Sequence, residues 1–168
     1  MRRFQEASDD AAFDEIISRY HRPALIIARD HLAGHPSLAE DAVQEAFIRT
    51  VRSRDRFDCE RSFAAWFYTI LRNVCLDFRR KEIRREKQLH EMAEQTPRAT
   101  DDPHAELDIA SILQSLPPAD REILIYRFIH NMTFREIAEQ IGSSLEATKK
   151  RAQRALRHFR TNAPAAGR

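Results

Sequence analysis

Glycine is scarce in this sequence, with three residues in 168, and no segment alternates apolar and polar residues for long enough to indicate a strand. Tight hairpin turns favour glycine, and a half-buried strand shows that alternation. The composition therefore argues against a β-rich fold. Apolar residues recur instead at intervals of three and four, the spacing of an amphipathic helix, which predicts an all-α protein.

Long hydrophobic runs are also missing. Runs such as LIIA at 25–28 are far shorter than the roughly 18 apolar residues that cross a bilayer as a helix. The N-terminal MRRFQEASDD has no apolar centre of the kind found in signal peptides. We therefore expect no membrane insertion and a cytoplasmic location.

Residues that commonly carry chemistry are few and scattered. The two cysteines, Cys59 and Cys75, lack the CxxC spacing of a redox or zinc site, and the seven histidines form no paired ligand motif. The sequence also shows no phosphate-binding glycine loop and no nucleophile signature. It predicts a non-enzymatic protein with no catalytic residues, no metal site and no cofactor, whose thiols are structural or incidental.

Charge is divided unevenly along the chain, although its net value is only +2. Residues 72–88 hold seven Lys or Arg against three acids, and residues 142–168 hold seven against one. Residues 89–110, between them, hold six acids against one Arg. Because a partner experiences the local field, the chain presents two basic zones on either side of an acidic one.

One stretch separates two parts of the chain. EQTPRATDDP at 94–103 mixes Pro, Thr, Asp and Gln with no apolar period, so it is predicted to be a flexible linker. It leaves residues 1–93 on one side and 104–168 on the other. The expected architecture is two small helical domains joined by this linker.

The first predicted domain shows several helical patterns. Pro23 starts or kinks a second helix that runs to Leu32, and Ser37 followed by Glu40 has the form of a capping box. The apolar residues of the first helix are Phe13, Ile16, Ile17 and Tyr20. Those of the helix after Ser37 are Val43, Phe47, Thr50 and Val51. These faces are predicted to form a compact helical bundle.

A polar loop at 52–62 precedes a long helix with a basic end. The apolar residues that recur along this helix are Phe63, Trp66, Ile70, Val74 and Phe78. Aromatic side chains between cations can stack unpaired bases, which suits single-stranded nucleic acid. The alternative is that Phe63, Trp66 and Phe67 are core residues.

The second predicted domain opens with a helix from Pro103 to Leu116, which Pro117 and Pro118 end because proline donates no backbone hydrogen bond. Asp120 is predicted to cap the next helix, 121–129. Thr133 and Glu136 suggest a capping box for a short helix whose inward residues are Phe134, Ile137, Ala138 and Ile141.

Gly142 fits a left-handed turn, and Ser143 or Ser144 can cap the helix that follows. The apolar stripe expected on this last helix is Leu145, Thr148, Ala152, Ala155 and Phe159. A short helix, a glycine turn and a longer basic helix form the pattern of a helix-turn-helix, whose second helix enters the major groove. A surface helix with a solvated basic face is the alternative.

Four segments together resemble the two conserved regions of the extracytoplasmic-function sigma factors, the small bacterial initiation factors that recruit core RNA polymerase to promoters. They are AEDAVQEAFIRTV (39–51), DRFDCERSFAAWFYTILRNVCLDFRRK (55–81), LPPADREILIYRF (116–128) and TFREIAEQIG (133–142) with the basic helix after it. The resemblance runs from Phe13 to Phe159 in the family's order. It implies a non-enzymatic specificity subunit that an anti-sigma factor sequesters.

The resemblance also implies roles for particular residues. Asp41, Gln44 and Glu45 match a DxxQE motif that, with Ile48, docks on the clamp helices of the largest polymerase subunit. The second domain is expected to contact the flap of the second-largest subunit. The residues implied at the minus-ten element, where a base is flipped and the strands melt, are Arg56, Asp58, Arg61, Ser62, Phe63, Trp66, Arg72, Asn73, Arg79 and Arg80. Those implied at the duplex minus-thirty-five element are Lys149, Lys150, Arg151, Gln153, Arg154 and Arg157.

The sequence departs from the family pattern at two places. The run that enters the last helix is commonly Gly-Thr-Val-Lys-Ser-Arg, whereas residues 146–151 here read EATKKR, and an outward Glu146 would repel phosphate. Cys59 stands where glycine is usual in the base-capture loop. The rival hypothesis is a stand-alone helix-turn-helix regulator that binds duplex operator DNA and uses its first domain to dimerise.

Overall fold

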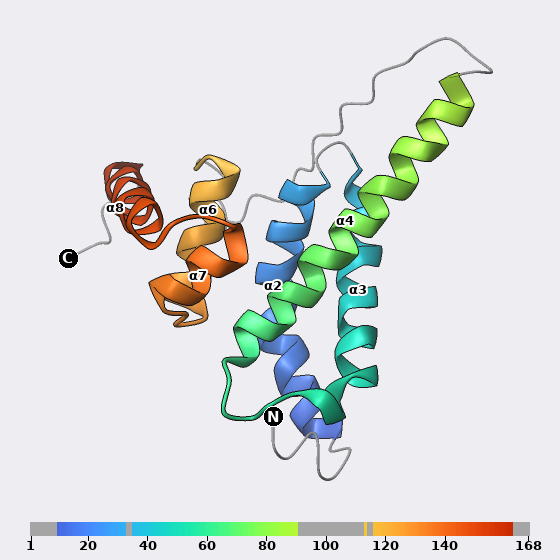
Figure 1. Cartoon of the computed structure of the whole chain (residues 1–168), viewed down its shortest axis with the longest axis horizontal. Coiled ribbons are helices and arrows are strands. Elements are labelled where there is room, and N and C mark those ends of the chain that lie inside the picture. Colours follow the sequence, from blue (N-terminus) through green and yellow to red (C-terminus); the bar gives the residue numbers. More distant parts are fainter. Residues whose placement is uncertain (1–9, 33–34, 91–112, 114–115, 163–168) are drawn as a thin grey trace. The chain divides into compact units, whose positions relative to one another are not determined.

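The computed structural model describes residues 10–32, 35–90, 113 and 116–162, and Figure 1 shows them as helices joined by turns and loops. No strand occurs among these residues, so the prediction of an all-α fold is confirmed for them. The chain divides into two compact units, residues 1–101 and 102–168. The predicted linker, 94–103, and the start of the helix predicted from Pro103 lie outside the described residues.

The first unit is built from three helices that contact one another, α2 (Asp10–His31), α3 (Pro36–Arg52) and α4 (Phe63–His90), with a short 3-10 turn η1 (Arg54–Arg56) between α3 and α4. Tyr20 of α2, Phe47 of α3 and Phe67 of α4 meet at its centre. The ring of Phe67 lies 5.3 Å from that of Tyr20 and 5.0 Å from that of Phe47. Each helix thus contributes at least one aromatic ring to a shared core.

Two expectations about helix starts in this unit need correction. Pro23 lies inside α2, which continues through it, so no second helix begins there. Ser37 does not cap α3, because that helix begins one residue earlier, at Pro36, after the cap residue His35. Proline is favoured as the first helical residue because the backbone donor that it lacks has no partner within the helix at this position.

The buried face of α4 also differs from the predicted one. Of the five apolar residues predicted to mark its face, only Val74 is fully buried, and the others are partly exposed. The residues that are buried are Ala64, Phe67, Tyr68, Leu71, Val74 and Cys75. Because α4 contacts both α2 and α3, its covered face is centred on Phe67, Leu71 and Val74, and Phe63, Trp66 and Phe78 lie at its edges.

The second unit contains α6 (Pro118–Leu124), a π-helical turn η2 (Ile125–Ile129), α7 (Phe134–Ile141) and α8 (Leu145–Asn162). Its core residues are Leu113, Leu116, Ile123, Leu124, Ile125, Tyr126, Met132, Ile137, Ala138, Ala152 and Ala155. The helix predicted over 121–129 is therefore α6 and η2 together. In η2 the amide of His130 donates to the carbonyl of Ile125, 3.2 Å away, the longer step that defines a π turn.

The start of α6 differs from the prediction. Pro117 is the cap residue and Pro118 the first helical residue, so Asp120 lies within the first turn and does not cap the helix. Arg121 instead joins α6 to the segment before it, because its Nε donates to the carbonyl of Leu113 at 2.7 Å and its Nη2 to that of Leu116 at 3.0 Å.

The connection between α7 and α8 follows the prediction closely. Thr133 and Glu136 form a complete capping box at the start of α7. Gly142 ends α7 in the left-handed conformation, with φ 66° and ψ 42°. Ser144 caps α8, since its Oγ accepts a hydrogen bond from the amide of Ala147 at 3.2 Å. These three signals fix where each helix of the pair begins and ends.

Within the described residues, no helix combines the length and the apolar character that crossing a membrane requires.

Candidate protein and nucleic-acid interfaces

One side of α3 carries the residues of the DxxQE motif; we refer to Asp41, Gln44, Glu45 and Ile48 as the acidic face. Asp41, Gln44 and Ile48 are exposed, whereas the side chain of Glu45 is 31% exposed. The opposite side of α3 is buried through Ala39, Ala42, Val43, Ala46 and Phe47. Helical spacing thus turns the motif outward, as predicted, and the bundle core holds it there.

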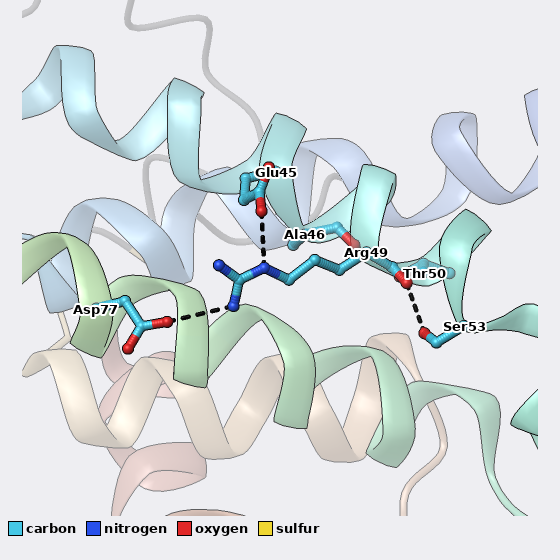
Figure 2. A network of polar contacts seen from close by, with 6 residues as sticks. All are labelled: Glu45, Ala46, Arg49, Thr50, Ser53 and Asp77. Carbon is cyan, nitrogen blue, oxygen red and sulfur yellow. Dashed lines mark hydrogen bonds and ion pairs between the residues drawn. The ribbon is translucent and has the colours of Figure 1, made fainter.

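Glu45 is held by a neighbour on its own helix. Its Oε1 accepts a hydrogen bond from Nε of Arg49 at 2.7 Å, and Nη1 of Arg49 reaches Oδ2 of Asp77 on α4 at 3.2 Å (Figure 2). The hydrogen bond with Glu45 is the largest influence that raises the pKa of Arg49, and Asp77 adds to it against the opposing effect of desolvation. The acidic face is therefore connected to α4 by a bridging guanidinium.

The sequence did not reveal an apolar hollow beside the acidic face. Phe13 and Ile17 of α2 line it with Phe47 and Ile48 of α3. Phe13 and Ile17 were predicted to face the core with Ile16 and Tyr20, but both are only partly buried. The helical spacing of Phe13 and Ile17 indicated an apolar face. The position of the hollow next to the motif depends on how α2 packs on α3, which the sequence does not state.

The loop before α4 is ordered by its own polar groups. The carboxylate of Asp58 accepts a hydrogen bond from the amide of Glu60 at 3.0 Å and lies 3.6 Å from Nε of Arg61. Ser62 caps α4, because its Oγ accepts the amide of Ala65 at 3.3 Å. The side chains of Asp58 and Arg61, like that of Arg56 in η1, face solvent. The local turns thus present these predicted minus-ten residues at one end of α4.

Aromatic rings form a cluster where this loop meets α4. The ring of Phe57 lies 4.7 Å from that of Trp66, and Phe63 lies 5.8 Å from both. Phe57 is buried, whereas Phe63 and Trp66 are partly exposed. Phe67 is fully buried and is therefore a core residue, whereas Phe63 and Trp66 are partly exposed, so base stacking stays a prediction for these two.

Further along α4, the polar residues predicted at the minus-ten element are exposed: Arg72, Asn73, Arg79 and Arg80. They alternate with the buried Leu71, Val74 and Cys75, so one helix supports a core on one side and cations on the other. Arg80 is 68% exposed and lies 3.8 Å from Asp77. Such a basic stripe offers phosphate contacts at little desolvation cost.

The last helix separates its apolar and basic residues in the same way. Thr148, Ala152 and Ala155 are buried against α6 and α7, as the predicted stripe requires, while Leu145 and Phe159 are partly buried. Four of the residues predicted to contact the minus-thirty-five element are exposed on α8: Lys150, Gln153, Arg154 and Arg157.

Carboxylates hold two cations of α8. Lys149 Nζ lies 2.9 Å from Glu146 in the first turn, and Arg151 Nε lies 2.7 Å from Asp120 of α6. The guanidinium of Arg151 therefore fastens α8 to α6.

Neither cysteine has the exposure of a surface thiol, since Cys75 is buried and Cys59 is partly so. Across the parts of the chain that the structure describes, His, Cys, Asp and Glu side chains nowhere gather in a group of three or more suited to a metal ion.

Each of the two units matches a known protein family. Residues 16–85 match the model of sigma-70 region 2, and residues 106–159 match that of sigma-70 region 4. The RNA polymerase sigma factor SigV of Bacillus subtilis (strain 168) is 30% identical over 73% of this chain and 74% of its own length. The sigma factor CarQ of Myxococcus xanthus is 28% identical over 95% of this chain and 93% of its own.

A solved structure shares the fold. The sigma factor RpoE of Bartonella quintana, crystallised with the anti-sigma factor NepR, superimposes with a TM-score of 0.60 at 21% identity, over 89% of this chain and 95% of that one. The family matches cover both helical units in the order that the sequence motifs predict. The chain belongs to the sigma-70 family of RNA polymerase sigma factors, in its extracytoplasmic-function group.

Proposed function

We propose that the acidic face of α3 docks this sigma factor on the clamp helices of the largest subunit of core RNA polymerase. As a sigma factor, the chain works with polymerase at promoter DNA. The observation that carries the proposal is the outward placement of Asp41 and Gln44 beside Ile48, which is 44% exposed. Carboxylates at the rim favour cations of a partner, and the apolar hollow beside them supplies surface to bury.

The loop before α4 and the exposed side of that helix are then proposed to hold the melted minus-ten strand. Phe63 and Trp66 are partly exposed aromatic side chains proposed to stack on a flipped base, and Asp58, Arg61 and Ser62 supply polar groups in the loop beside them. Base stacking on an aromatic ring contributes about 1–3 kcal/mol. The residues proposed to contact the sugar-phosphate backbone are Arg56, Arg72, Asn73, Arg79 and Arg80.

The second unit is proposed to read the duplex minus-thirty-five element and to contact the polymerase flap. Lys150, Gln153 and Arg154 project from the exposed side of α8, where long side chains reach base edges and phosphates. Arg157 extends the same side. Lys149 and Arg151, which carboxylates hold, are proposed to act nearer the rim of this surface.

An anti-sigma factor is the proposed regulator. The RpoE structure with NepR gives an instance of such a partner on this fold. On this chain, the acidic face and the adjoining apolar hollow form the surface that a sequestering protein would cover to block polymerase. The place of action is then the cytoplasm, where polymerase meets promoter DNA.

Charge reversal on α3 tests the docking surface. Asp41→Lys combined with Glu45→Lys should weaken the affinity for core polymerase at least tenfold, because rim charges that attract the partner would repel it. Asp14→Lys combined with Glu15→Lys, on the exposed side of α2, makes the same change in charge and should leave that affinity within about twofold. Helical content by circular dichroism should stay unchanged in both. Equal core affinity for the two variants contradicts the assignment.

Transcription in vitro separates this function from that of a stand-alone regulator. Purified chain with core polymerase should initiate from its cognate promoters in a genomic promoter library. The double variant at 41 and 45 should not. A stand-alone regulator would bind duplex operator tightly without polymerase and would need another factor to initiate, so that outcome would overturn the proposal.

A further inference from the structure

Four charged side chains of alternating sign connect α3 to α4. Glu45 accepts from Arg49 at 2.7 Å, and Arg49 reaches Oδ2 of Asp77 at 3.2 Å (Figure 2). The other oxygen of Asp77, Oδ1, lies 3.8 Å from Nη1 of Arg80. We refer to Glu45, Arg49, Asp77 and Arg80 as the charge relay.

The two ends of the charge relay belong to different proposed surfaces. Glu45 is part of the acidic face, and Arg80 is one of the cations proposed to hold DNA. Arg49 and Asp77 belong to neither, yet they lie between the two ends. Their side chains are 40% and 43% exposed, so their pairing is weak enough to be exchanged for another partner.

The backbone of Arg49 is held in place, while its guanidinium bridges two helices. The backbone amide and the hydroxyl of Ser53 both donate to the carbonyl of Arg49, at 3.0 and 2.5 Å, where α3 ends. Thr50 donates to the carbonyl of Ala46 at 2.8 Å one turn earlier. Figure 2 shows the guanidinium extending from this anchored turn between Glu45 and Asp77.

We propose that Arg49 and Asp77 are positioning residues that couple docking on polymerase to the grip of Arg80 on DNA. Each member of the charge relay competes for its neighbour. Asp77 competes with DNA phosphate for Arg80, and Arg49 competes with Arg80 for Asp77. When a cation of polymerase engages Glu45, Arg49 turns more fully to Asp77, and Asp77 releases Arg80 to the phosphate.

This proposal rests on the proposed function, because it needs Glu45 to meet polymerase and Arg80 to meet DNA. Exposed ion pairs of this kind change an equilibrium by about two- to fivefold. Coupling between two binding sites is reciprocal, so DNA should strengthen core binding by the same factor. The relay would therefore favour the assembled initiation complex over the separate chain.

Asp77→Asn tests the DNA end on the free chain. Its affinity for a mixed-sequence single-stranded oligonucleotide should rise about two- to fivefold, because Arg80 loses its competing carboxylate. Glu82→Gln, which removes the same charge from the same helix, should raise it less. In an Arg80→Gln background, Asp77→Asn should have no more effect than Glu82→Gln. A merely structural role for Asp77 would lower the affinity instead.

Core polymerase tests the coupling itself. The ratio of affinities for a mixed-sequence bubble duplex, with core against without core, should fall about two- to fivefold in both Arg49→Gln and Asp77→Asn. Unchanged ratios in both variants overturn the relay, as does an effect of Asp77→Asn that persists without Arg80. If Arg80→Gln alone leaves the affinity for DNA unchanged, the proposed contact of Arg80 with DNA is wrong as well. If Arg80→Gln lowers the affinity for DNA but the ratios stay unchanged in the other two variants, only the relay is wrong.

Discussion

Arg151 of α8 donates from Nε to Oδ1 of Asp120 of α6 at 2.7 Å, and the Asp120 side chain is only 18% exposed. This pair joins the helix that carries the basic surface to the helix beneath it. Asp120 is in the first turn of α6, where a carboxylate also interacts favourably with the helix dipole. The pair therefore sets the orientation of α8 rather than adding one more cation to its exposed side.

Asp120→Asn and Arg151→Gln should each lower the free energy of unfolding by about 1 kcal/mol, because each leaves the other half of a partly buried charged hydrogen bond without its partner. The double variant should lose little more than either single one. Chemical unfolding followed by circular dichroism gives the double-mutant cycle. Arg154→Gln is the control, because its exposed side chain predicts almost no loss of stability. Additive losses at 120 and 151 would contradict a direct pair.

The caps give a second prediction, with an internal comparison. Thr133 accepts the amide of Glu136 at 3.2 Å and completes a capping box, whereas Ser37 lies inside α3 and caps nothing. Thr133→Ala should therefore lower the free energy of unfolding by about 1 kcal/mol, and Ser37→Ala should change it by less than about 0.5 kcal/mol. Thermal unfolding of the two variants measures the difference. Equal losses would mean that the sequence motif at 37–40 does act as a cap.

The contrast between Ser37 and Thr133 shows what the sequence predicts well. Signals that act within one helix turn, such as the capping box at Thr133 and the left-handed Gly142, were predicted correctly because their partners lie within four residues. At Ser37 the same motif competed with Pro36, which starts a helix at its own position because its φ angle is already helical. Local competition between two valid signals was the source of the error.

Relations between helices were harder to predict. Periodicity predicted α4, but it centred the buried face on residues such as Trp66 and Phe78 that lie at its edges. The observed face depends on packing against both α2 and α3. The outward direction of Asp41 and Gln44 was predictable from spacing alone. The contact between Arg49 and Asp77 spans 28 positions, so no local pattern contains it. The pairing of Arg151 with Asp120 was missed for the same reason.

The buried phenol of Tyr20 makes the stability of the first unit depend on alkaline pH. Burial raises the pKa of its phenol, and the nearby charge of Arg19 opposes this effect only in part. In the unfolded chain the phenol ionises near pH 10, so above that pH the folded state retains a proton that the unfolded state has lost. The stabilising contribution of the neutral phenol is therefore complete below about pH 10 and is lost as pH rises through the raised pKa.

Tyr20→Phe should make the free energy of unfolding less dependent on pH in this range. The proton of Tyr20 contributes a slope of up to about 1.4 kcal/mol per pH unit, which phenylalanine lacks. Urea unfolding at about pH 9, 10 and 11 measures the slope for both proteins. The comparison uses slopes, so a constant loss from removing the hydroxyl does not affect it. Identical slopes would show that Tyr20 ionises equally easily in both states.

Glu146 stands where the family commonly has glycine at the entry to the last helix, and in the structure this residue pairs with Lys149. Its carboxylate lies 2.9 Å from Nζ of Lys149 and is 73% exposed in the first turn of α8. A negative charge there stabilises the helix start, but it also competes with phosphate for Lys149 and repels DNA directly. We therefore expect Glu146 to weaken the attraction of α8 for duplex DNA of any sequence.

Glu146→Gln should raise the affinity of the free chain for mixed-sequence duplex, and the dependence of log affinity on log salt should steepen by about one unit as Lys149 gains a phosphate. Glu139→Gln, on the exposed side of α7, removes the same charge without touching Lys149 and controls for net charge. Fluorescence anisotropy over a salt series measures both quantities. If the two variants gain equally and neither slope changes, Lys149 does not reach the duplex. A gain confined to Glu146→Gln would instead mean that this carboxylate limits non-specific binding, so that selection of a promoter depends more on the base contacts of Lys150, Gln153 and Arg154.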